Sequence, residues 1–184
     1  HRPWELFEKV FYGLFETVAA KVVGKKKFRF KNKLVSIDST VIDLCLSMYD
    51  WAKFRTTKGA VKLHLVLDHD GYLPCFGIIT DGKVADVKAA HQMHFAPDTI
   101  VVDDRGYNDY RLFAKWTDAG VYFVTRMKDN TLFEVVEEHT VPQNRNIIKD
   151  QTIRLTGTGA QDKCPHLLRR VEAIREDTGG TLVF

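Results

Sequence analysis

"IVVDDRGYNDY" (residues 100–110) joins a short apolar run to two adjacent carboxylates. The β-branched residues at its start predict a buried strand, and alternation along a strand would send Asp103 and Asp104 to opposite faces. The next segment, "NDYRLFAKWTDAG" (108–120), predicts a helix with an Asn N-cap and a closing Gly, and "VYFVTRM" (121–127) predicts another strand. A strand, a helix and a strand in this order indicate an α/β fold with parallel pairing.

The sequence upstream of this stretch predicts further strands and helices. Apolar and aromatic residues at helical spacing over 4–23 predict an amphipathic helix whose stripe packs in a core. "KLVSIDST" (33–40) predicts a short strand ending at Asp38, "AVKLHLVLDHDGYLPCFGIIT" (60–80) a hairpin, and 84–95 a helix. These elements together indicate a mixed sheet with flanking helices.

The pattern changes after about residue 128, where short strand-like runs are separated by Pro, Asn, Gly and Asp. We therefore expect three parts in the chain. They are an amphipathic helix with a basic linker over 1–33, an α/β core over 34–128 and a β-rich subdomain over 129–184.

The composition is that of a globular protein and excludes several classes. The chain has 184 residues, of which 45% are hydrophobic and 28% charged, which suits one core-bearing domain with a small appendage. It has no apolar run of about 18 residues and no signal-peptide pattern, so we expect a cytoplasmic protein without a membrane span. Cys45, Cys75 and Cys164 lie far apart and form no CxxC pair, which disfavours a disulfide framework and a thiolate zinc site.

The net charge of +3 is unevenly distributed. Residues 1–33 carry nine Lys and Arg against three Glu, whereas the remaining residues carry eighteen against twenty-one acids. The excess peaks in "GKKKFRFKNK" (24–33), which has six cations, two aromatic residues and no acid. Such a run suits a polyanion, because each neutralised phosphate releases counterions. A solvated linker is the alternative.

Carboxylates stand at the ends of two predicted strands, at Asp38 and at the pair Asp103 and Asp104. If the two strands are neighbours, carboxylates distant in sequence meet at one sheet edge, where a divalent cation would offset their repulsion. Oxygen-only ligation suits Mg²⁺ or Mn²⁺, and a two-metal site of this kind cleaves phosphodiesters. The alternative is structural: these residues cap turns or helices, or pair with Arg105.

A zinc site is a second alternative for metal binding. His91 and His94 have H-x2-H spacing and could bind zinc together with Asp86. On a helix such a pair of histidines is more often a surface or packing feature, and the sequence offers no fourth ligand nearby.

"SIDST" followed by "DRGYNDY" resembles the DDE transposases of bacterial insertion sequences, specifically the insertion-sequence-four group. In that family the first catalytic Asp lies in an apolar strand before Ser or Thr, which matches Asp38, and the second lies in a D-x-G-Y/F motif, which matches Asp104. The resemblance covers about 34–130 and implies an RNase H-like fold with a β-rich insertion. Three further segments agree in family order: "WAKFRTTKGAVKLH" (51–64), "ITDGKVADVKAA" (79–90) and "FVTRMKDN" (123–130).

The family also needs a third acid, a Glu on a helix with a Y-x2-R-x3-E-x6-K pattern, and this chain has no such pattern. Glu172 and Glu176 are the nearest candidates, but neither has the Tyr or Lys at the required spacing. We expect that the chain stops before this helix. The fragment would then be nearly inactive by itself and poorly soluble, with its two-metal site complete only in the whole protein.

The resemblance implies metal-dependent DNA strand cleavage and strand transfer in cut-and-paste transposition, by a homodimer on DNA near the nucleoid. The alternatives are an inactive transposase-derived DNA-binding or regulatory protein and a stand-alone RNase H-like nuclease. Asp38 and Asp104 are the expected catalytic and metal-binding residues. The basic residues expected to contact DNA phosphates are Lys25, Lys26, Lys27, Arg29, Lys53, Arg55, Lys58, Lys62, Arg105, Arg126 and Lys128.

Overall fold

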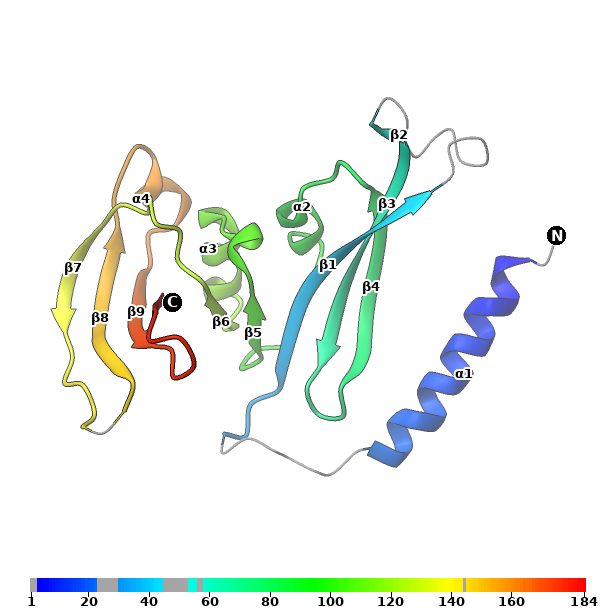
Figure 1. Cartoon of the computed structure of the whole chain (residues 1–184), viewed down its shortest axis with the longest axis horizontal. Helices are drawn as coiled ribbons and strands as arrows, with labels where there is room; N and C mark the ends of the chain where they lie inside the picture. Colours follow the sequence, from blue (N-terminus) through cyan, green and yellow to red (C-terminus); the bar gives the residue numbers. More distant parts are fainter. Residues whose placement is uncertain (1–2, 23–29, 45–52, 56–57, 144) are drawn as a thin grey trace. The chain divides into compact units, whose positions relative to one another are not determined.

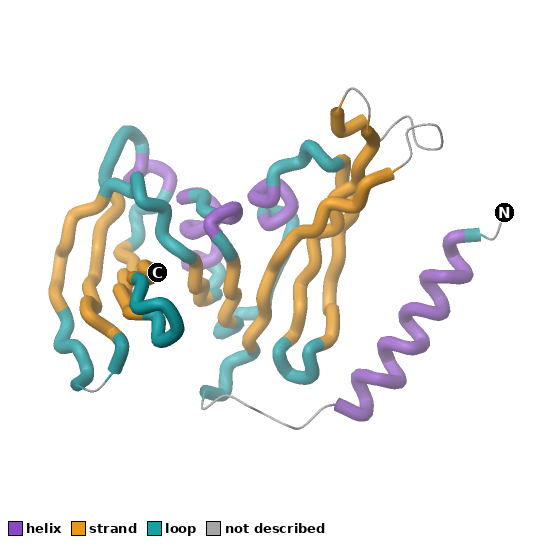
Figure 2. Tube along the Cα trace, viewed as in Figure 1, coloured by secondary structure: helices purple, strands orange, loops and turns teal. Residues whose placement is uncertain are grey.

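The computed structural model describes residues 3–22, 30–44, 53–55, 58–143 and 145–184. The chain forms two compact units, His1–Lys83 and Val84–Phe184, and each is described by itself (Figure 1). Both units combine helices with strands (Figure 2), and antiparallel and parallel pairing both occur. The predicted mixed α/β class is therefore confirmed.

The N-terminal amphipathic helix is confirmed as α1 (Trp4–Val22). Its predicted packing is not. Within the described residues its apolar side chains are exposed: Leu6, Phe7, Val10, Phe11, Leu14 and Val18. Phe11 stacks on Phe15, with ring centroids 6.3 Å apart, so the aromatic residues partly cover one another along the helix. The spacing predicted the helix, but spacing alone does not say what covers its face.

The sheet of the first unit is antiparallel, with β3 (Lys58–Asp68) at its centre. Strand β3 pairs with β1 (Leu34–Leu44), and also with β2 (Lys53–Arg55) and β4 (Leu73–Asp81). The turn between β3 and β4 contains Gly71 and Tyr72 at positive φ, at 122° and 57°. The predicted hairpin over 60–80 is thus confirmed.

Strand β1 is longer than the sequence predicts. It continues through the β-branched residues after Asp38 to Leu44, because these pair with β3 as well. Asp38 therefore lies within the strand, opposite Leu65, and the prediction that the strand ends at Asp38 is wrong. Val35 and Ile37 are buried and Asp38 is exposed, as alternation requires.

A βαβ motif follows α2 in the second unit. Strand β5 (Ile100–Asp103) leads through a single 3₁₀ turn, η1 (Arg105–Tyr107), into α3 (Tyr110–Asp118) and then β6 (Tyr122–Thr125). Strands β5 and β6 are parallel, as predicted, with Asp103 in register with Thr125. Gly120 (φ 68°) follows α3, so the predicted stop is confirmed.

Two helix predictions need correction. The helix expected over 84–95 is only the short α2 (Asp86–Ala90), after which the main chain turns. In that turn the Lys115 ammonium donates to the carbonyls of His91 (2.5 Å) and Met93 (3.2 Å), which a longer helix would use for its own hydrogen bonds. The N-cap of α3 is Asp109 rather than Asn, because its carboxylate accepts the Leu112 N–H at 2.9 Å.

The β-rich character of the C-terminal part is confirmed. An antiparallel sheet has the order β10-β9-β8-β7. Its strands are β7 (Phe133–Glu138), β8 (Ile147–Leu155), β9 (Leu167–Ile174) and β10 (Thr181–Val183), and the short helix α4 (Ala160–Lys163) follows β8.

This sheet shares a core with α3. Phe113 of α3 lies in one buried cluster with Ile153 and Leu155 of β8 and with Cys164. Phe113 also stacks on Phe123 of β6, with ring centroids 4.7 Å apart and an angle of 11° between the rings. The domain boundaries at 33 and 128 stay predictions.

Two further observations concern the predicted classes. Among the described residues no helix has the length and apolarity to cross a membrane. Cys75 and Cys164 are free thiols, and Cys45 lies outside the described residues.

Candidate active site around Asp104

The Asp104 carboxylate is exposed and is held by the turn that follows β5. Its Oδ1 accepts the Gly106 N–H at 2.7 Å, which makes Asp104 the N-cap of η1. Its carbonyl oxygen accepts the Tyr107 N–H at 3.1 Å. Tyr107 is 1% exposed, so the turn is anchored in the core while the carboxylate points to solvent. The D-x-G-Y sequence thus gives a rigid turn with one accessible carboxylate.

Asp103 differs from Asp104 in its burial and in its hydrogen bonding. It is 8% exposed, and neither carboxylate oxygen has a hydrogen bond within the described residues. Burial raises the pKa of Asp103 to about 7; the charge of Asp104 adds to the rise, and the Thr125 hydroxyl opposes it. The expectation that the pair lies on opposite faces is confirmed. Of the capping roles considered for this pair, the structure gives that of the turn to Asp104.

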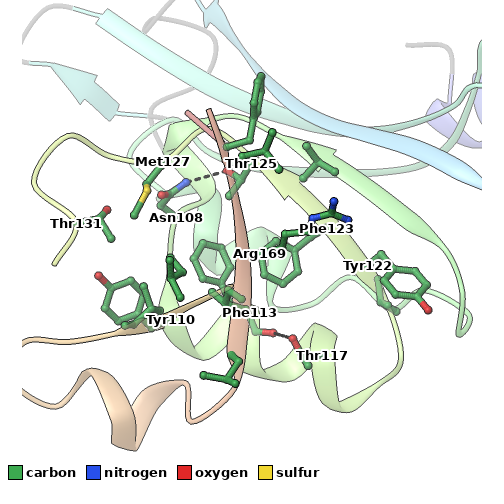
Figure 3. A pocket seen from close by; sticks show the side chains of 18 of the residues that line it. Asn108, Tyr110, Phe113, Thr117, Tyr122, Phe123, Thr125, Met127, Thr131 and Arg169 are labelled. Carbon is green, nitrogen blue, oxygen red and sulfur yellow. Dashed lines mark hydrogen bonds between the residues drawn. The ribbon is translucent and has the colours of Figure 1, made fainter. Parts of the chain in front are cut away.

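The turn after β5 is linked to the segment after β6 by side chains. The Asn108 amide donates to Thr125 Oγ1 at 2.8 Å (Figure 3) and to the Arg126 carbonyl at 3.1 Å. Thr125 Oγ1 in turn donates to the Asp104 carbonyl at 3.2 Å. No pattern in the sequence predicts this link, because Asn108 and Thr125 are 17 positions apart and only the strand register brings them together.

Asp86 of α2 lies beside this turn. A Cβ added to Gly106 would be 2.9 Å from Asp104 Oδ1 and 3.5 Å from Asp86 Oδ2. The two carboxylates therefore lie close to each other on the same side of Gly106. Their oxygen atoms concentrate negative charge at the exposed end of β5, where a hard cation would be favoured.

An apolar cavity of about 660 Å³ lies in the same unit, beside β6 (Figure 3). Its walls come from α3, β6, β8 and β9, and they include Phe113, Phe123, Ile153, Leu155 and Leu168. No sequence motif indicated it, since the lining segments are far apart in the chain.

Asp38 belongs to the first unit and is exposed on β1. Its Oδ1 accepts the Ser39 N–H at 2.7 Å, so the turn-like capping considered from the sequence is a local bond within a strand. That Asp38 and Asp104 come together at one site stays a prediction.

A family model described as "Transposase DDE domain" matches residues 29–171. The chain belongs to the DDE transposase family. Both Asp38 and Asp104 lie within the matched residues. The family that the sequence motifs resemble is thus confirmed.

Two curated relatives of this DDE transposase chain are themselves named as transposases. The protein y4zB of Sinorhizobium fredii (strain NBRC 101917 / NGR234) is 30% identical over 179 residues, which are 95% of this chain and 49% of the relative. A protein named for insertion sequence element IS5377 of Geobacillus stearothermophilus is 26% identical over 129 residues, which are 67% of this chain and 34% of the relative. The chain thus spans half the length of these relatives or less.

One solved structure similar to this DDE transposase chain is a piggyBac transposase synaptic complex with hairpin DNA. The TM-score is 0.42 and the identity 11%, over 82% of this chain and 32% of that chain.

The basic residues expected to bind DNA are only partly described. Lys25, Lys26, Lys27 and Arg29 lie outside the described residues, and of Lys53, Arg55 and Lys58 the structure describes the strands but not the side chains. Lys62 lies on β3 and is half-buried.

The three basic residues near Asp104 are described fully. One alternative was that Arg105 pairs with the neighbouring carboxylates of Asp103 and Asp104. In the structure it pairs instead with Asp129, through two hydrogen bonds of 3.2 and 3.1 Å. Lys128 is exposed, and its ammonium lies 3.5 Å from the Asn108 carbonyl. Arg126 is half-buried.

The zinc alternative finds no support in this geometry. His91 Nε2 lies 3.2 Å from Asp109 Oδ1, and His94 Nδ1 lies 3.0 Å from the Gln92 carbonyl. In the described part of the chain no three His, Cys, Asp or Glu side chains are gathered to hold a metal ion.

The two nearest candidates for a third acid do not match the helix that the DDE family requires. Glu172 lies on β9, where Arg170 binds it at 2.9 Å and, with Lys149, lowers its pKa. Glu176 accepts a hydrogen bond of 2.6 Å from Asn146. Both carboxylates therefore have structural partners.

Proposed function

We propose that this chain is part of the catalytic core of a transposase that cleaves and rejoins DNA in cut-and-paste transposition. The main support is the exposed Asp104 carboxylate, which the D-x-G-Y turn fixes directly beyond β5 in a chain of the DDE transposase family. In this proposal the two units adopt the RNase H-like fold of the family, and Asp38 and Asp104 bind the same pair of metal ions.

The donor groups fit Mg²⁺ or Mn²⁺. Asp38 and Asp104 offer exposed carboxylate oxygens, which both ions prefer. Asp86 adds negative charge beside Asp104, whereas Asp103, buried with a pKa of about 7, adds little charge below that pH. When bound, such a pair of ions activates the attacking oxygen and stabilises the leaving oxygen of a phosphodiester.

The chemistry has two balanced steps. In the first, water attacks the phosphorus at the element end, the P–O3′ bond breaks, and a 5′-phosphate and a free 3′-hydroxyl result. In the second, that 3′-hydroxyl attacks a phosphodiester of the opposite strand or of the target and displaces another 3′-oxygen. Each step exchanges one P–O bond for another, so neither needs an oxidant or an energy source.

The proposal includes a third acid outside residues 1–184, because no Y-x2-R-x3-E-x6-K pattern occurs among them. The chain by itself would then bind metal weakly and leave DNA uncut. The substrate is DNA at the element ends and at the target, bound by a homodimer. Lys128 near Asp104 and the basic run at 24–33 are the favoured phosphate contacts.

The test is Mg²⁺-dependent cleavage of DNA carrying the element ends by the full-length protein. Asp38→Asn and Asp104→Asn should abolish cleavage, whereas Asp103→Asn should retain it. Asp177→Asn is the matched control, since this exposed residue pairs with Arg175 in the β9–β10 turn. Loss of cleavage in Asp103→Asn together with full activity in Asp104→Asn would show that the wrong residue has been assigned.

A further inference from the structure

The Thr125 hydroxyl connects two parts of the candidate site. A hydroxyl has one proton to donate and lone pairs to accept with, and its proton ordinarily rotates freely. Here the Asn108 amide donates to Thr125 Oγ1 at 2.8 Å, which occupies the accepting side. The Thr125 proton is then available to the Asp104 carbonyl, 3.2 Å away, and the Asp103 carboxylate is a second acceptor for it. The result is a relay from Asn108 through Thr125 to Asp104.

These hydrogen bonds lie just beyond the end of the β5–β6 pairing. Strand β5 ends at Asp103, which is in register with Thr125, so Asp104 is the first residue beyond the ladder. Asp104 has φ −100° and ψ −179°, and the chain then bends into η1. Thr125, the last residue of β6, reaches forward by one residue and binds the carbonyl that the ladder leaves out.

The relay is separate from the contacts that fold the turn. Tyr107 (1% exposed) and Leu112 (0% exposed) anchor the turn and α3 in the core. The Asn108 amide makes a second bond, to the Arg126 carbonyl at 3.1 Å, so the relay is tied to the end of β6 at two points. The Asp104 peptide is thus held at its carbonyl by Thr125, while the Gly106 N–H holds its carboxylate.

We propose that Thr125 and Asn108 are positioning residues that set the orientation of the Asp104 carboxylate for metal binding. The inference rests on the proposed role of Asp104 as a metal ligand. Groups that orient a ligand typically change metal affinity by about 10- to 100-fold when they are removed. Neither residue touches metal or DNA in this proposal, so their loss should act on the metal dependence and not on DNA binding.

The test compares Thr125→Val, which removes the hydroxyl and keeps the shape, with Thr125→Ser, which keeps the hydroxyl. Thr117→Val is the matched control, because the Thr117 hydroxyl donates to the Phe113 carbonyl at 2.8 Å within α3. The full-length protein is titrated with Mn²⁺ by calorimetry, and cleavage is measured against Mn²⁺ concentration. A third readout is the amide proton shift of Gly106 by NMR without metal, which reports its hydrogen bond to Asp104.

Thr125→Val and Asn108→Ala should weaken Mn²⁺ binding by about 10-fold or more and raise the Mn²⁺ concentration for half-maximal cleavage equally. DNA affinity should not change, Thr125→Ser should stay within about twofold of the wild type, and the Gly106 amide should shift in Thr125→Val. An unchanged Gly106 amide or unchanged Mn²⁺ affinity in Thr125→Val overturns the inference, and so does an equal loss in Thr117→Val. Asp104→Asn decides the proposed function separately: Mn²⁺ affinity unchanged in that variant rejects the ligand role, while the Gly106 shift still tests the relay.

Discussion

Asp103 and Asp104 are consecutive residues with opposite environments: Asp103 is 8% exposed and lacks any hydrogen bond within the described residues, whereas Asp104 is exposed and accepts the Gly106 N–H. The buried carboxyl is costly when ionised, because it loses water and the Thr125 hydroxyl offsets that loss only in part. The exposed one keeps its contact with solvent. One step along the chain, from the last residue of β5 to the turn after it, therefore separates a residue that opposes folding at neutral pH from a residue whose carboxylate is accessible to a cation.

The first prediction concerns stability and pH. The folded pKa of Asp103, about 7, lies above the unfolded value near 4, so the unfolded state binds fewer protons between these values and stability falls as pH rises through this window. Asp103→Asn should remove this loss. The variant should gain up to about 4 kcal/mol over the wild type at pH 8 and almost nothing at pH 3.

Urea denaturation of the chain with EDTA, at a series of pH values, measures this difference. Asp104→Asn is the matched control, one residue along, and it should leave in place the pH dependence that the burial of Asp103 causes. A pH-independent effect of Asp103→Asn would contradict the prediction.

The second prediction concerns Gly106. Gly106→Ala should reduce metal-dependent cleavage, because the new Cβ would lie 2.9 Å from Asp104 Oδ1 and would push the carboxylate away from the Gly106 N–H. A displacement of about 1 Å at a reacting centre can reduce the rate by about 100-fold. Cleavage kinetics of the full-length protein measure it. In Gly77→Ala, where the nearest atoms are 3.6 Å away, activity should be retained, and equal losses in the two variants would argue against a steric cause.

The third prediction concerns the pair of Arg105 and Asp129. Asp129 holds the Arg105 guanidinium through two bonds, so a DNA phosphate must compete with it. Asp129→Asn should strengthen DNA binding and steepen its salt dependence by about one unit of log K per log salt. Fluorescence anisotropy at several salt concentrations measures both quantities. Asp177→Asn, which releases the comparable Arg175 in the β9–β10 turn, should leave the salt slope unchanged.

The fourth prediction compares two ion pairs on the C-terminal sheet. Asp150 is buried and binds Arg169 through two hydrogen bonds, which hold the pKa of Asp150 below its usual range. Because the folded pKa is the lower one, this stabilisation is present above the unfolded value near 4 and is lost as pH falls through the folded value.

Asp150→Asn should therefore lower the free energy of unfolding by about 1–3 kcal/mol at pH 7 and by less at pH 3. Asp177→Asn breaks an exposed pair of the same geometry and should cost clearly less, because solvent screens that pair. Thermal denaturation at the two pH values distinguishes the variants, and equal costs would mean that burial of Asp150 has no influence.

Much of the fold follows from local sequence patterns. The hairpin of β3 and β4, the parallel pair β5 and β6 and the end of α3 at Gly120 were all predictable, because each depends on residues near one another in the chain. The length of β1 was not predictable, since its second half is a strand only by pairing with β3. The shortening of α2 depends on Lys115, which is distant in sequence.

The candidate site was predictable as residue types but not as geometry. The D-x-G-Y motif identified Asp104, and alternation along the strand placed Asp103 on the other face. Which of the two is the cap, and which is buried without a hydrogen bond, depends on the packing around β5. The partners Thr125 and Asn108 come from the register of β5 and β6, which no spacing in the sequence encodes.

The buried thiol of Cys164 can report how often the core of the second unit opens. Its thiol is 0% exposed in the cluster shared by α3 and the C-terminal sheet, and burial raises its pKa, so it is protected from alkylating reagents while that cluster stays closed. Cys75 is exposed. In a chain with Cys45→Ser and Cys75→Ser, the single remaining thiol would be modified only as fast as the sheet separates from α3. The rate of that modification then measures how often the shared core opens.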